Sequence, residues 1–540
     1  MTAHGEITYA LPSLLKSAYH ACNEIQREIY DELDIPDVDL QICCQLLLQI
    51  IKLNTESGAF DLLGDRRSMF DKVQPFIDDS SIEIICEKSA YYGHIDCLKL
   101  AREIGVPWSP PYYYNSHGSA CDQAASTGNL ECLIYAHENG SPWSGRTCQS
   151  AACDGHLECL RYLHENGCAW YSNTCSAAAE FGHLDCLKYA HENGCPWDYG
   201  TCLWAAFKGN LDCLIYAYEN NFPRDEHVCY NAAKGGHLNC LMYAHEYEEG
   251  PWSEHVCSAA AEGGHLECLR YAHENGFWWD VNTCASAALG GHLDCLIYAY
   301  ENGCSWEQHT CSYAADNGHL ACLKFAHENG CPWNKKTCSN AAEEGHLECL
   351  KYAHENGCRW DEKTCSLAAK NGHLNCLKYA HENGCPWSKK TCSNAAEGGH
   401  LECLKYAHEN GCRWDEKTCS LAAKNGHLNC LKYAHENGCP WTKKTCSNAA
   451  EGGHLECLKY AHENGCRWDE KTCSLAAKYG HLNCLRYAHE NGCKWDVHSA
   501  SFDSVEFGNK DCREYALKNG YPRFKNLSGV SKGENPSSSK

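Results

Sequence analysis

Cysteine and histidine are the residues of this sequence whose types and spacing could do chemistry. Of the 540 residues, 45 are cysteine and 32 are histidine. A cysteine often stands three positions after a histidine, as Cys376 stands after His373. Thiolate and imidazole groups at such spacing can bind zinc, and thiols can also form disulfides or act as nucleophiles.

A zinc site is the most specific chemical interpretation of this pattern, but the spacing of the cysteines and histidines does not support it. Structural zinc sites need four converging ligands, often supplied as Cys-x-x-Cys pairs, and the sequence contains no such pair. His381 follows Cys376 by five positions, about 140° around a helix, so the two side chains do not share a ligand face. We therefore predict no metal and no cofactor.

The sequence gives no support for a catalytic site either. The sequence has no phosphate-binding glycine loop, no dinucleotide fingerprint, no His-Glu-x-x-His and no Gly-x-Ser-x-Gly. A nucleophilic cysteine needs its own electropositive surroundings, whereas these cysteines recur in equivalent settings. We predict that the protein is not an enzyme.

Charge and hydropathy exclude further classes. The net charge is −24, with 17 basic and 45 acidic residues in 1–330 but 29 and 25 in 331–540. This acidic balance predicts no nucleic-acid partner. The first residues lack a signal-peptide pattern, and no stretch approaches the roughly 18 apolar residues of a membrane helix. We expect no membrane association and reduced cysteines in the cytoplasm.

Most of the cysteines belong to an internal repeat. The pattern Gly-(His/Asn)-x-x-Cys occurs sixteen times, and twelve of the fifteen intervals have the same length, that from Cys349 to Cys376. Forty-one of the 45 cysteines fall at three positions of this repeat. Buried cysteine packs as a small apolar residue. Equivalent cysteines of neighbouring repeats should lie about 8–10 Å apart, too far for disulfides.

One repeat shows which elements must position these residues. Thr364 is placed to cap a short helix, on which Cys365, Ala368 and Ala369 form one small apolar face. Gly372 then permits a tight reversal of the chain.

A second helix is expected from about Leu374. Leu377, Ala380 and His381 fall on its apolar arc, and Gly384 ends it. Helices of only about 8–10 residues are unstable alone, so each repeat must bury its apolar surface on its neighbours.

The repeat resembles the ankyrin repeat. The resemblance spans about residues 82–525, and it rests on the string T-x-x-x-A-A-x-x-G-H-L-x-x-L, which reads here Thr364, Ala368, Ala369, Gly372, His373, Leu374 and Leu377, followed by Gly384. Ankyrin repeats are longer, typically about 33 residues. The missing residues fall where ankyrins form their β-hairpin, and a Cys-Pro-Trp or Cys-Arg-Trp connector replaces it. The chain looks like the short, Trp-bearing ankyrin-like repeats of large DNA viruses and of some protists and algae.

The resemblance implies an all-α, ankyrin-like solenoid of about 16 helix-turn-helix units with shortened or absent β-hairpins. At about 8–10 Å per unit, such a stack would extend roughly 130–160 Å. We expect three regions: a helical cap or small helical domain at 1–81, the solenoid at 82–525 and a disordered tail at 526–540. The family implies protein–protein interaction without catalysis. The alternative is a substrate adaptor whose N-terminal region, 1–81, recruits a ubiquitin ligase or other machinery.

A 54-residue double repeat is copied in tandem inside the array. Residues 331–384 differ from 385–438 at only two positions, and residues 385–438 differ from 439–492 at three. Connector lysines and arginines recur with this period and could form a basic strip for an acidic protein partner, although interleaved acids also fit a merely solvated edge. These candidates are Lys335, Lys336, Arg359, Lys389, Lys390, Arg413, Lys443, Lys444 and Arg467.

Two aromatic features complete the candidates. Tyr112, Tyr113 and Tyr114 follow two prolines in the one long interval between repeats, where they could bind a partner or pack as a surface loop. The connector tryptophans, Trp108 through Trp495, are predicted to cover the helices where the hairpin is missing; the alternative is that they bind a partner. The function predicted from the sequence is a monomeric scaffold for protein partners.

Overall fold

The computed structural model describes residues 84–103, 105–108, 118–223, 225–247, 253, 255–469, 471–494 and 509–519. The chain divides into two compact units, residues 1–279 and 280–540, and each is described by itself. Within the described ranges there are 31 helices and no strand. The fold is all-α, and no helix in these ranges is long and apolar enough to cross a membrane.

Each repeat contributes a first and a second helix. In the first unit the first helices are α6 (Ile85–Tyr91), α8 (Ala120–Ser126), α10 (Gly145–Cys153), α12 (Asn173–Glu180), α14 (Gly200–Lys208), α16 (Val228–Gly235) and α18 (Val256–Gly263). The second helices are α7 (Ile95–Glu103), α9 (Leu130–Glu138), α11 (Leu157–Glu165), α13 (Leu184–Glu192), α15 (Leu211–Glu219), α17 (Leu238–Tyr247) and α19 (Leu266–Glu274).

The second unit continues the same alternation. Its first helices are α20 (Val281–Gly290), α22 (Gln308–Asp316), α24 (Lys335–Glu343), α26 (Glu362–Lys370), α28 (Lys389–Gly398), α30 (Glu416–Lys424), α32 (Lys443–Gly452) and α34 (Lys471–Lys478). Its second helices are α21 (Leu293–Glu301), α23 (Leu320–Glu328), α25 (Leu347–Glu355), α27 (Leu374–Glu382), α29 (Leu401–Glu409), α31 (Leu428–Glu436), α33 (Leu455–Glu463) and α35 (Leu482–Glu490), and α36 (Lys510–Lys518) follows.

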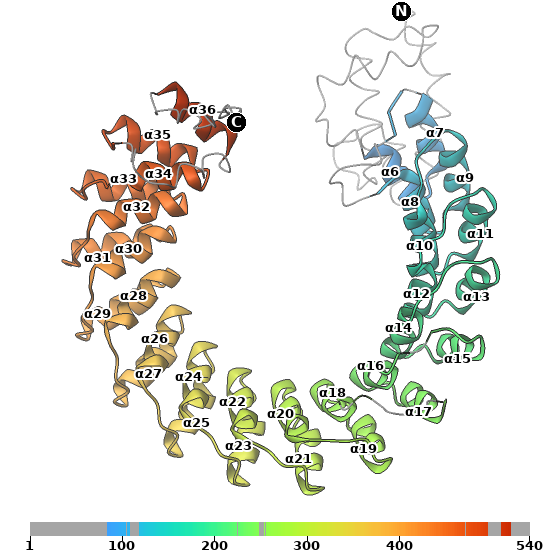
Figure 1. Cartoon of the computed structure of the whole chain (residues 1–540), viewed down its shortest axis with the longest axis horizontal. Helices are drawn as coiled ribbons and strands as arrows, with labels where there is room; N and C mark the ends of the chain where they lie inside the picture. The colour runs from blue at the N-terminus through green and yellow to red at the C-terminus, as the bar shows by residue number, and fades with distance from the viewer. Residues whose placement is uncertain are drawn as a thin grey trace, which may run out of the picture. The chain divides into compact units, whose positions relative to one another are not determined.

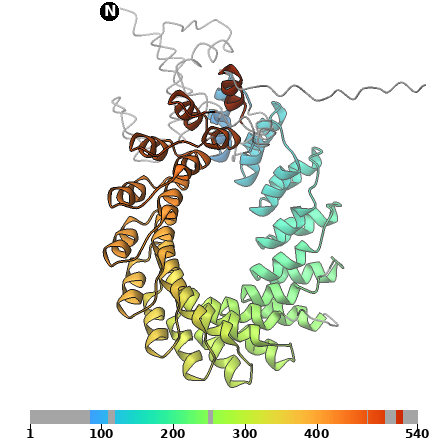
Figure 2. The same cartoon turned by 60° about the vertical axis from the view of Figure 1, so that its left-hand side comes forward.

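The helices form a solenoid within each unit. Inside a unit, every first helix packs on the first helix of the next repeat and on its own second helix. Figures 1 and 2 show, in each unit, the first helices in one row and the second helices in a parallel row. The prediction of a helical solenoid is therefore confirmed.

Small apolar side chains make the core of each repeat. Cys365, Ala368 and Ala369 of α26 and Leu377 and Ala380 of α27 are completely buried. The same positions are buried in the neighbouring repeats, so the core is a stack of equivalent layers. Because alanine and cysteine are small, the paired helices can approach each other closely.

The predicted cap of the first helix is wrong by three positions. The N-cap of α26 is Asp361, whose Oδ1 accepts a hydrogen bond from the Lys363 backbone N–H at 3.0 Å. Asn334, Ser388, Asp415 and Thr442 occupy the corresponding positions of the neighbouring repeats. Thr364 instead lies inside the helix and is completely buried, because a good capping residue already stands three positions earlier.

The histidine of each Gly-His pair packs on the repeat before it. Gly372 has φ +83°, and a Cβ built there would lie 2.4 Å from His400 Nδ1 of the next repeat. His319 Nε2 lies 3.1 Å from the Leu289 carbonyl oxygen, and so ties one inter-helix turn to the preceding one. The glycine is thus required by its backbone conformation and by the close approach of this imidazole.

The connector tryptophans pack between repeats. Trp387 stacks on His381 with ring centroids 3.7 Å apart, and both contact Tyr406 of the next repeat edge-on. His381 Nδ1 also forms a hydrogen bond with the Tyr406 hydroxyl at 3.0 Å. The aromatic groups therefore join successive repeats where ankyrins carry a hairpin, as the sequence predicts.

Candidate interaction surface

Nearly all of the described cysteines are shielded from solvent. All 42 described cysteines are free thiols, and every one except Cys153 is buried. Burial raises the pKa of the Cys376 thiol to about 11. A thiol that stays protonated at neutral pH is a poor nucleophile and a poor metal ligand. Among the described residues, no group of three histidine, cysteine or acidic side chains is arranged to hold a metal ion.

The closest thiol neighbours belong to different repeat positions. Cys338 donates a hydrogen bond to the carbonyl oxygen of Cys358 at 3.9 Å, and Cys358 donates to the carbonyl oxygen of Asn334 at 3.2 Å. A hydrogen bond between the two thiols raises the pKa of Cys338, and burial raises it further. The same hydrogen bond lowers the pKa of Cys358. The prediction from the sequence considered only equivalent cysteines of neighbouring repeats, so it did not include this contact between cysteines at two different repeat positions.

Ten such thiol pairs, all with the same separation in sequence, recur along the described chain. They are Cys148/Cys168, Cys175/Cys195, Cys284/Cys304, Cys311/Cys331, Cys338/Cys358, Cys365/Cys385, Cys392/Cys412, Cys419/Cys439, Cys446/Cys466 and Cys473/Cys493. Each pair links the first helix of a repeat to the connector after the following second helix. The pairs therefore recur as part of the repeat rather than forming one unique site.

The basic candidates are exposed and occupy two kinds of position. Lys335, Lys336, Lys389, Lys390, Lys443 and Lys444 lie in the first turns of α24, α28 and α32. Arg359, Arg413 and Arg467 lie in the connectors before α26, α30 and α34. Arg467 lines a hollow of about 500 Å³ with His462 and Gly492, whereas Lys443 and Lys444 line a different one. These two hollows share Trp468 and Asp469, and the basic strip stays a prediction.

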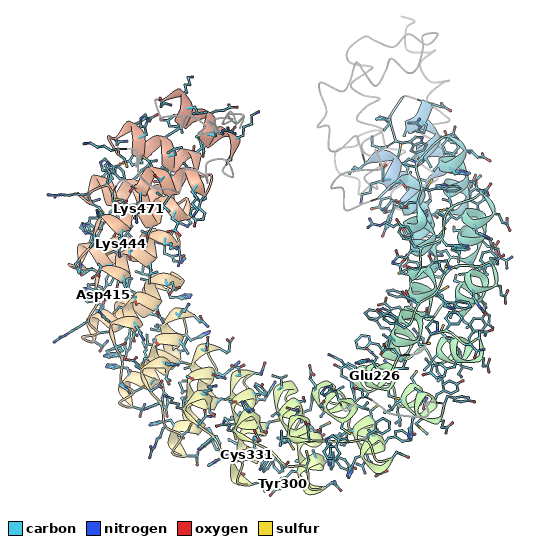
Figure 3. The ribbon with its side chains drawn as sticks, in the orientation of Figure 1. Glu226, Tyr300, Cys331, Asp415, Lys444 and Lys471 are labelled. Atoms are coloured by element: carbon cyan, nitrogen blue, oxygen red, sulfur yellow. The ribbon has the colours of Figure 1, made fainter. Side chains whose placement is uncertain are left out.

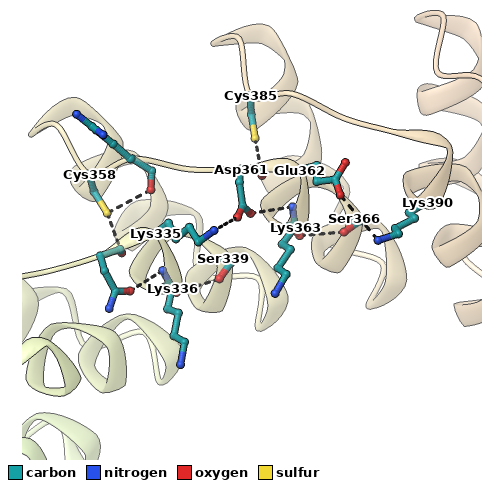
Figure 4. A network of polar contacts seen from close by, with 12 residues as sticks. Lys335, Lys336, Ser339, Cys358, Asp361, Glu362, Lys363, Ser366, Cys385 and Lys390 are labelled. Atoms are coloured by element: carbon teal, nitrogen blue, oxygen red, sulfur yellow. Dashed lines mark hydrogen bonds and ion pairs between the residues drawn. The ribbon is translucent and has the colours of Figure 1, made fainter.

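Two of the candidate lysines form close ion pairs inside the array. Lys335 Nζ lies 2.8 Å from Asp361 Oδ2, and Lys389 Nζ lies 2.8 Å from Asp415 Oδ2. The hydrogen bond to Asp361 raises the pKa of Lys335. Burial raises the pKa of Asp361, but hydrogen bonds from Lys335 and the Lys363 backbone outweigh it and hold that pKa below its usual value. Figure 4 shows this network between α24, α26 and α28.

A second set of lysines is continuous along six repeats. The second residue of α24, α26, α28, α30 and α32, and the first of α34, is an exposed lysine. We call this set the lysine row; its members are Lys336, Lys363, Lys390, Lys417, Lys444 and Lys471. Lys444 and Lys471 are labelled in Figure 3 on neighbouring helices. Within this row, Lys390 also lies 3.8 Å from Glu362, a weak exposed contact.

Helix electrostatics do not favour these lysines. The N-terminal turn of a helix carries a partial positive charge, and a cation there costs about 0.3–1 kcal/mol. The helix dipole therefore gives no reason for a lysine at this position of six successive first helices, although Lys363 and Lys417 do attract the N-cap carboxylates Asp361 and Asp415. In the first unit the corresponding positions before α16 and α18 hold His227 and His255. The lysine row belongs to the second unit and to its copied repeats.

An open hollow lies beside the lysine row. Its volume is about 920 Å³, and α30, α32 and α34 supply its walls. Lys417, Lys444 and Lys471 line it together with the half-buried side chains of Leu421 and Leu475. Its remaining lining residues are Glu416, Ser420, Lys443, Ser447, Asn448, Trp468 and Asp469. The hollow thus combines an apolar floor with an excess of positive charge.

Sequence reasoning missed the apolar part of this surface. Leucine and asparagine alternate from repeat to repeat at one position of the first helices: Leu367, Asn394, Leu421, Asn448 and Leu475. The asparagines bridge to the preceding helix, since Asn448 Nδ2 donates to the Ser420 carbonyl oxygen at 3.2 Å. The 54-residue alternation was a visible signal for this arrangement.

The aromatic candidates Tyr112, Tyr113 and Tyr114 lie outside the described residues, and their role stays a prediction. The first unit does expose other aromatic side chains on its first helices. Trp204 of α14 is 43% exposed, and Tyr230 of α16 lines a hollow of about 390 Å³ with His227 and His255. This surface has neither the lysines nor the repetition of the second unit.

Comparisons with known proteins give only distant structural likenesses. No family model matches the chain, and no curated protein matches it in sequence. The human ASB11 ankyrin repeat domain is 18% identical and aligns over 34% of this chain and 99% of that chain, with a TM-score of 0.30. The pentatricopeptide repeat protein PPR10, solved in complex with an 18-nt psaJ RNA element, is 12% identical and aligns over 88% of this chain and 98% of its own, with a TM-score of 0.30. The assignment to helical repeat proteins therefore rests on the chain's own helices.

Proposed function

We propose that this protein is a non-catalytic scaffold that binds an acidic protein partner along the lysine row of its second unit. The observation that carries this proposal is the exposed lysine at one position of six successive first helices. The helix dipole does not favour these lysines, and they stand beside a partly apolar hollow. Apolar contact area supplies affinity, and the surrounding charge selects and orients the partner.

The rest of the chain suits this role. The repeats are of the short ankyrin-like type, and the protein acts as a monomer in a reducing, cytoplasmic compartment. Its free and buried thiols support that compartment, because such thiols persist where disulfides do not form. The high pKa of thiols such as Cys376 supports a role without catalysis.

Two triple charge reversals test the proposal. K336E/K390E/K444E reverses alternate members of the lysine row. The matched control, K351E/K405E/K459E, reverses lysines of the same 54-residue period on the second helices, where each pairs with a glutamate three positions earlier at 2.8–2.9 Å.

Affinity capture from the native cell, quantified against wild type, gives the result. We expect K336E/K390E/K444E to capture at least about tenfold less partner than wild type, because several charge contacts are lost. The control should capture as much partner as wild type. Equal capture by both variants would contradict the proposed surface. Circular dichroism melting of both variants separates lost binding from lost folding.

A further inference from the structure

The lining of the hollow beside the lysine row occurs more than once in the array. The twelve lining residues recur with identical types one double repeat earlier. The earlier set comprises Glu362, Lys363, Ser366, Leu367, Lys389, Lys390, Ser393, Asn394, Trp414, Asp415, Lys417 and Leu421. A third set, one further double repeat earlier, differs in having His309 and Tyr313 in place of a lysine and a leucine, and Gln308 in place of a glutamate.

This repetition fixes the distance between equivalent sites. Packed helices lie about 8–10 Å apart, so two repeats advance the surface by roughly 16–20 Å. An extended polypeptide rises about 3.3 Å per residue, so five or six residues span that distance. Equivalent groups of such a polypeptide would meet equivalent hollows if they recurred at that interval.

We propose that the second unit binds an extended acidic polypeptide in which acidic residues flank an apolar side chain every five or six residues. This inference rests on the proposed function and names the partner's chemistry. Leu421 and Leu475 offer the floor for the apolar side chain, and Lys417, Lys444 and Lys471 offer the charges for its acidic neighbours. Occupying successive hollows raises affinity by avidity, because each further contact is intramolecular.

The lining favours a polypeptide over a nucleic acid. Glu416 and Asp469 lie beside the lysines in the hollow, and a polypeptide can place its few carboxylates away from them, whereas a nucleic acid carries a phosphate at every nucleotide. Trp468 is the one aromatic residue of the hollow, whereas single-stranded nucleic acids are typically held by several aromatic side chains that stack on successive bases. The tyrosines of the second helices are committed to contacts between repeats, as Tyr406 is to His381 and Trp387.

Synthetic peptides of equal composition test the spacing. The matched probe contains three Glu-Leu-Glu triplets whose centres lie six positions apart, joined by Gly-Ser-Gly, so that it is about 15 residues long. The control probe places the three triplets together and the Gly-Ser-Gly linkers at its ends. We expect fluorescence anisotropy to show at least about tenfold tighter binding of the matched probe to the full-length protein.

A deletion within the copied array gives an internal check. Removing residues 385–438 joins Gly384 to Cys439, which recreates the natural Gly-Cys-Pro junction. This variant loses one complete copy of the lining residues and two lysines of the row, Lys390 and Lys417. We expect the matched three-triplet probe to bind it severalfold more weakly than wild type, and a one-triplet probe to keep its Kd. An unchanged thermal unfolding transition shows that the shortened array is folded.

The outcomes separate this inference from the proposed function. Equal binding of the matched and control probes would overturn the spacing while leaving an acidic-partner surface in place. Failure of both probes, together with unchanged partner capture by K336E/K390E/K444E, would overturn both. Tighter binding of a single-stranded RNA of about 15 nucleotides than of the matched peptide would overturn the choice of a polypeptide.

Discussion

Most single residues of this molecule have equivalents at the same position of other repeats. Each glycine, cysteine or lysine occupies one position of a repeat and has nearly the same neighbours in the next. The repeat therefore supplies its own controls, because equivalent backbone positions differ in one contact at a time. Gly372 and Gly384 stand at different positions of one repeat, but both have φ +83° and only Gly372 faces a close side chain.

Gly372→Ala is expected to destabilise the protein more than Gly384→Ala. A left-handed backbone costs an alanine about 1–2 kcal/mol at either site. At Gly372 the new methyl group would also meet the His400 imidazole, whereas nothing lies within 4 Å at Gly384. Urea denaturation measures the difference, and H400A in the Gly372→Ala background should recover part of the excess loss. Equal destabilisation by the two substitutions would show that the imidazole contact is not tight.

The thiols should be almost inert in the folded state. Among the described cysteines only Cys153 is not buried, and burial raises the pKa of thiols such as Cys376 to about 11. Brief alkylation at pH 7.5 followed by peptide mass spectrometry should label Cys153 and leave Cys365 and Cys376 unmodified until denaturant is added. Rapid labelling of Cys376 in the native protein would contradict its place in the core.

Elements of this fold are short helices that gain stability only by stacking. The periodicity of the repeat was sufficient to predict two helices per repeat, the buried Cys-Ala-Ala face and the glycine at the end of the second helix. It placed the start of the first helix at Thr364, because several residues in the connector can cap a helix and spacing alone does not choose among them. In the folded protein the helix is capped by Asp361, which Lys335 of the preceding repeat also contacts.

The candidate surface was predicted less completely than the fold. Lysine and arginine positions were visible in the sequence, but their division between two hollows depends on how successive helices stack. The pairing of Cys338 with Cys358 was missed for a similar reason, because it joins a first helix to a connector beyond the second helix. Contacts between neighbouring repeats are set by packing, which a single repeat does not reveal.

Leu377→Ala tests the packing of the second helix. Leu377 is completely buried, and removing its side chain should cost about 2–5 kcal/mol. Chemical denaturation followed by circular dichroism measures the change. Tyr379, half-buried on the same helix, is a comparison site at which truncation to leucine should cost less. An unchanged transition for Leu377→Ala would contradict the burial of this face.

The inter-helix histidines should make stability depend on pH. Burial lowers the pKa of His319, His400 and His454, and neighbouring histidines lower it further. The unfolded chain therefore takes up protons more readily, and the stability these neutral side chains support is lost as the pH falls below about 6.5.

The triple variant H319N/H400N/H454N provides the check for this pH dependence. Asparagine already stands at this position in three repeats, and in two of them, Asn129 and Asn210, it donates hydrogen bonds to the preceding turn. Urea midpoints measured from pH 8 to pH 5 should fall less in the variant than in wild type. Identical pH profiles would show that these histidines do not titrate differently on folding.

At the scale of the whole molecule, function follows from how the two units differ. The copied repeats of the second unit present the same lysines and the same lining residues at regular intervals, whereas the first unit carries varied first helices. Residues 1–81 and 526–540 lie outside the described residues, so the helical cap, the tail and the alternative adaptor role stay predictions. Ligase components retained by the full-length chain but not by residues 82–540 would favour the adaptor.

Lysine footprinting of the complex tests the central claim most directly. The captured partner is added to the protein, lysines are acetylated briefly, and mass spectrometry compares the acetylation of each site with and without partner. The account predicts severalfold protection of Lys336, Lys390 and Lys444 and unchanged modification of Lys351 and its equivalents on the second helices. Protection of the second-helix lysines with the lysine row still modified would contradict it.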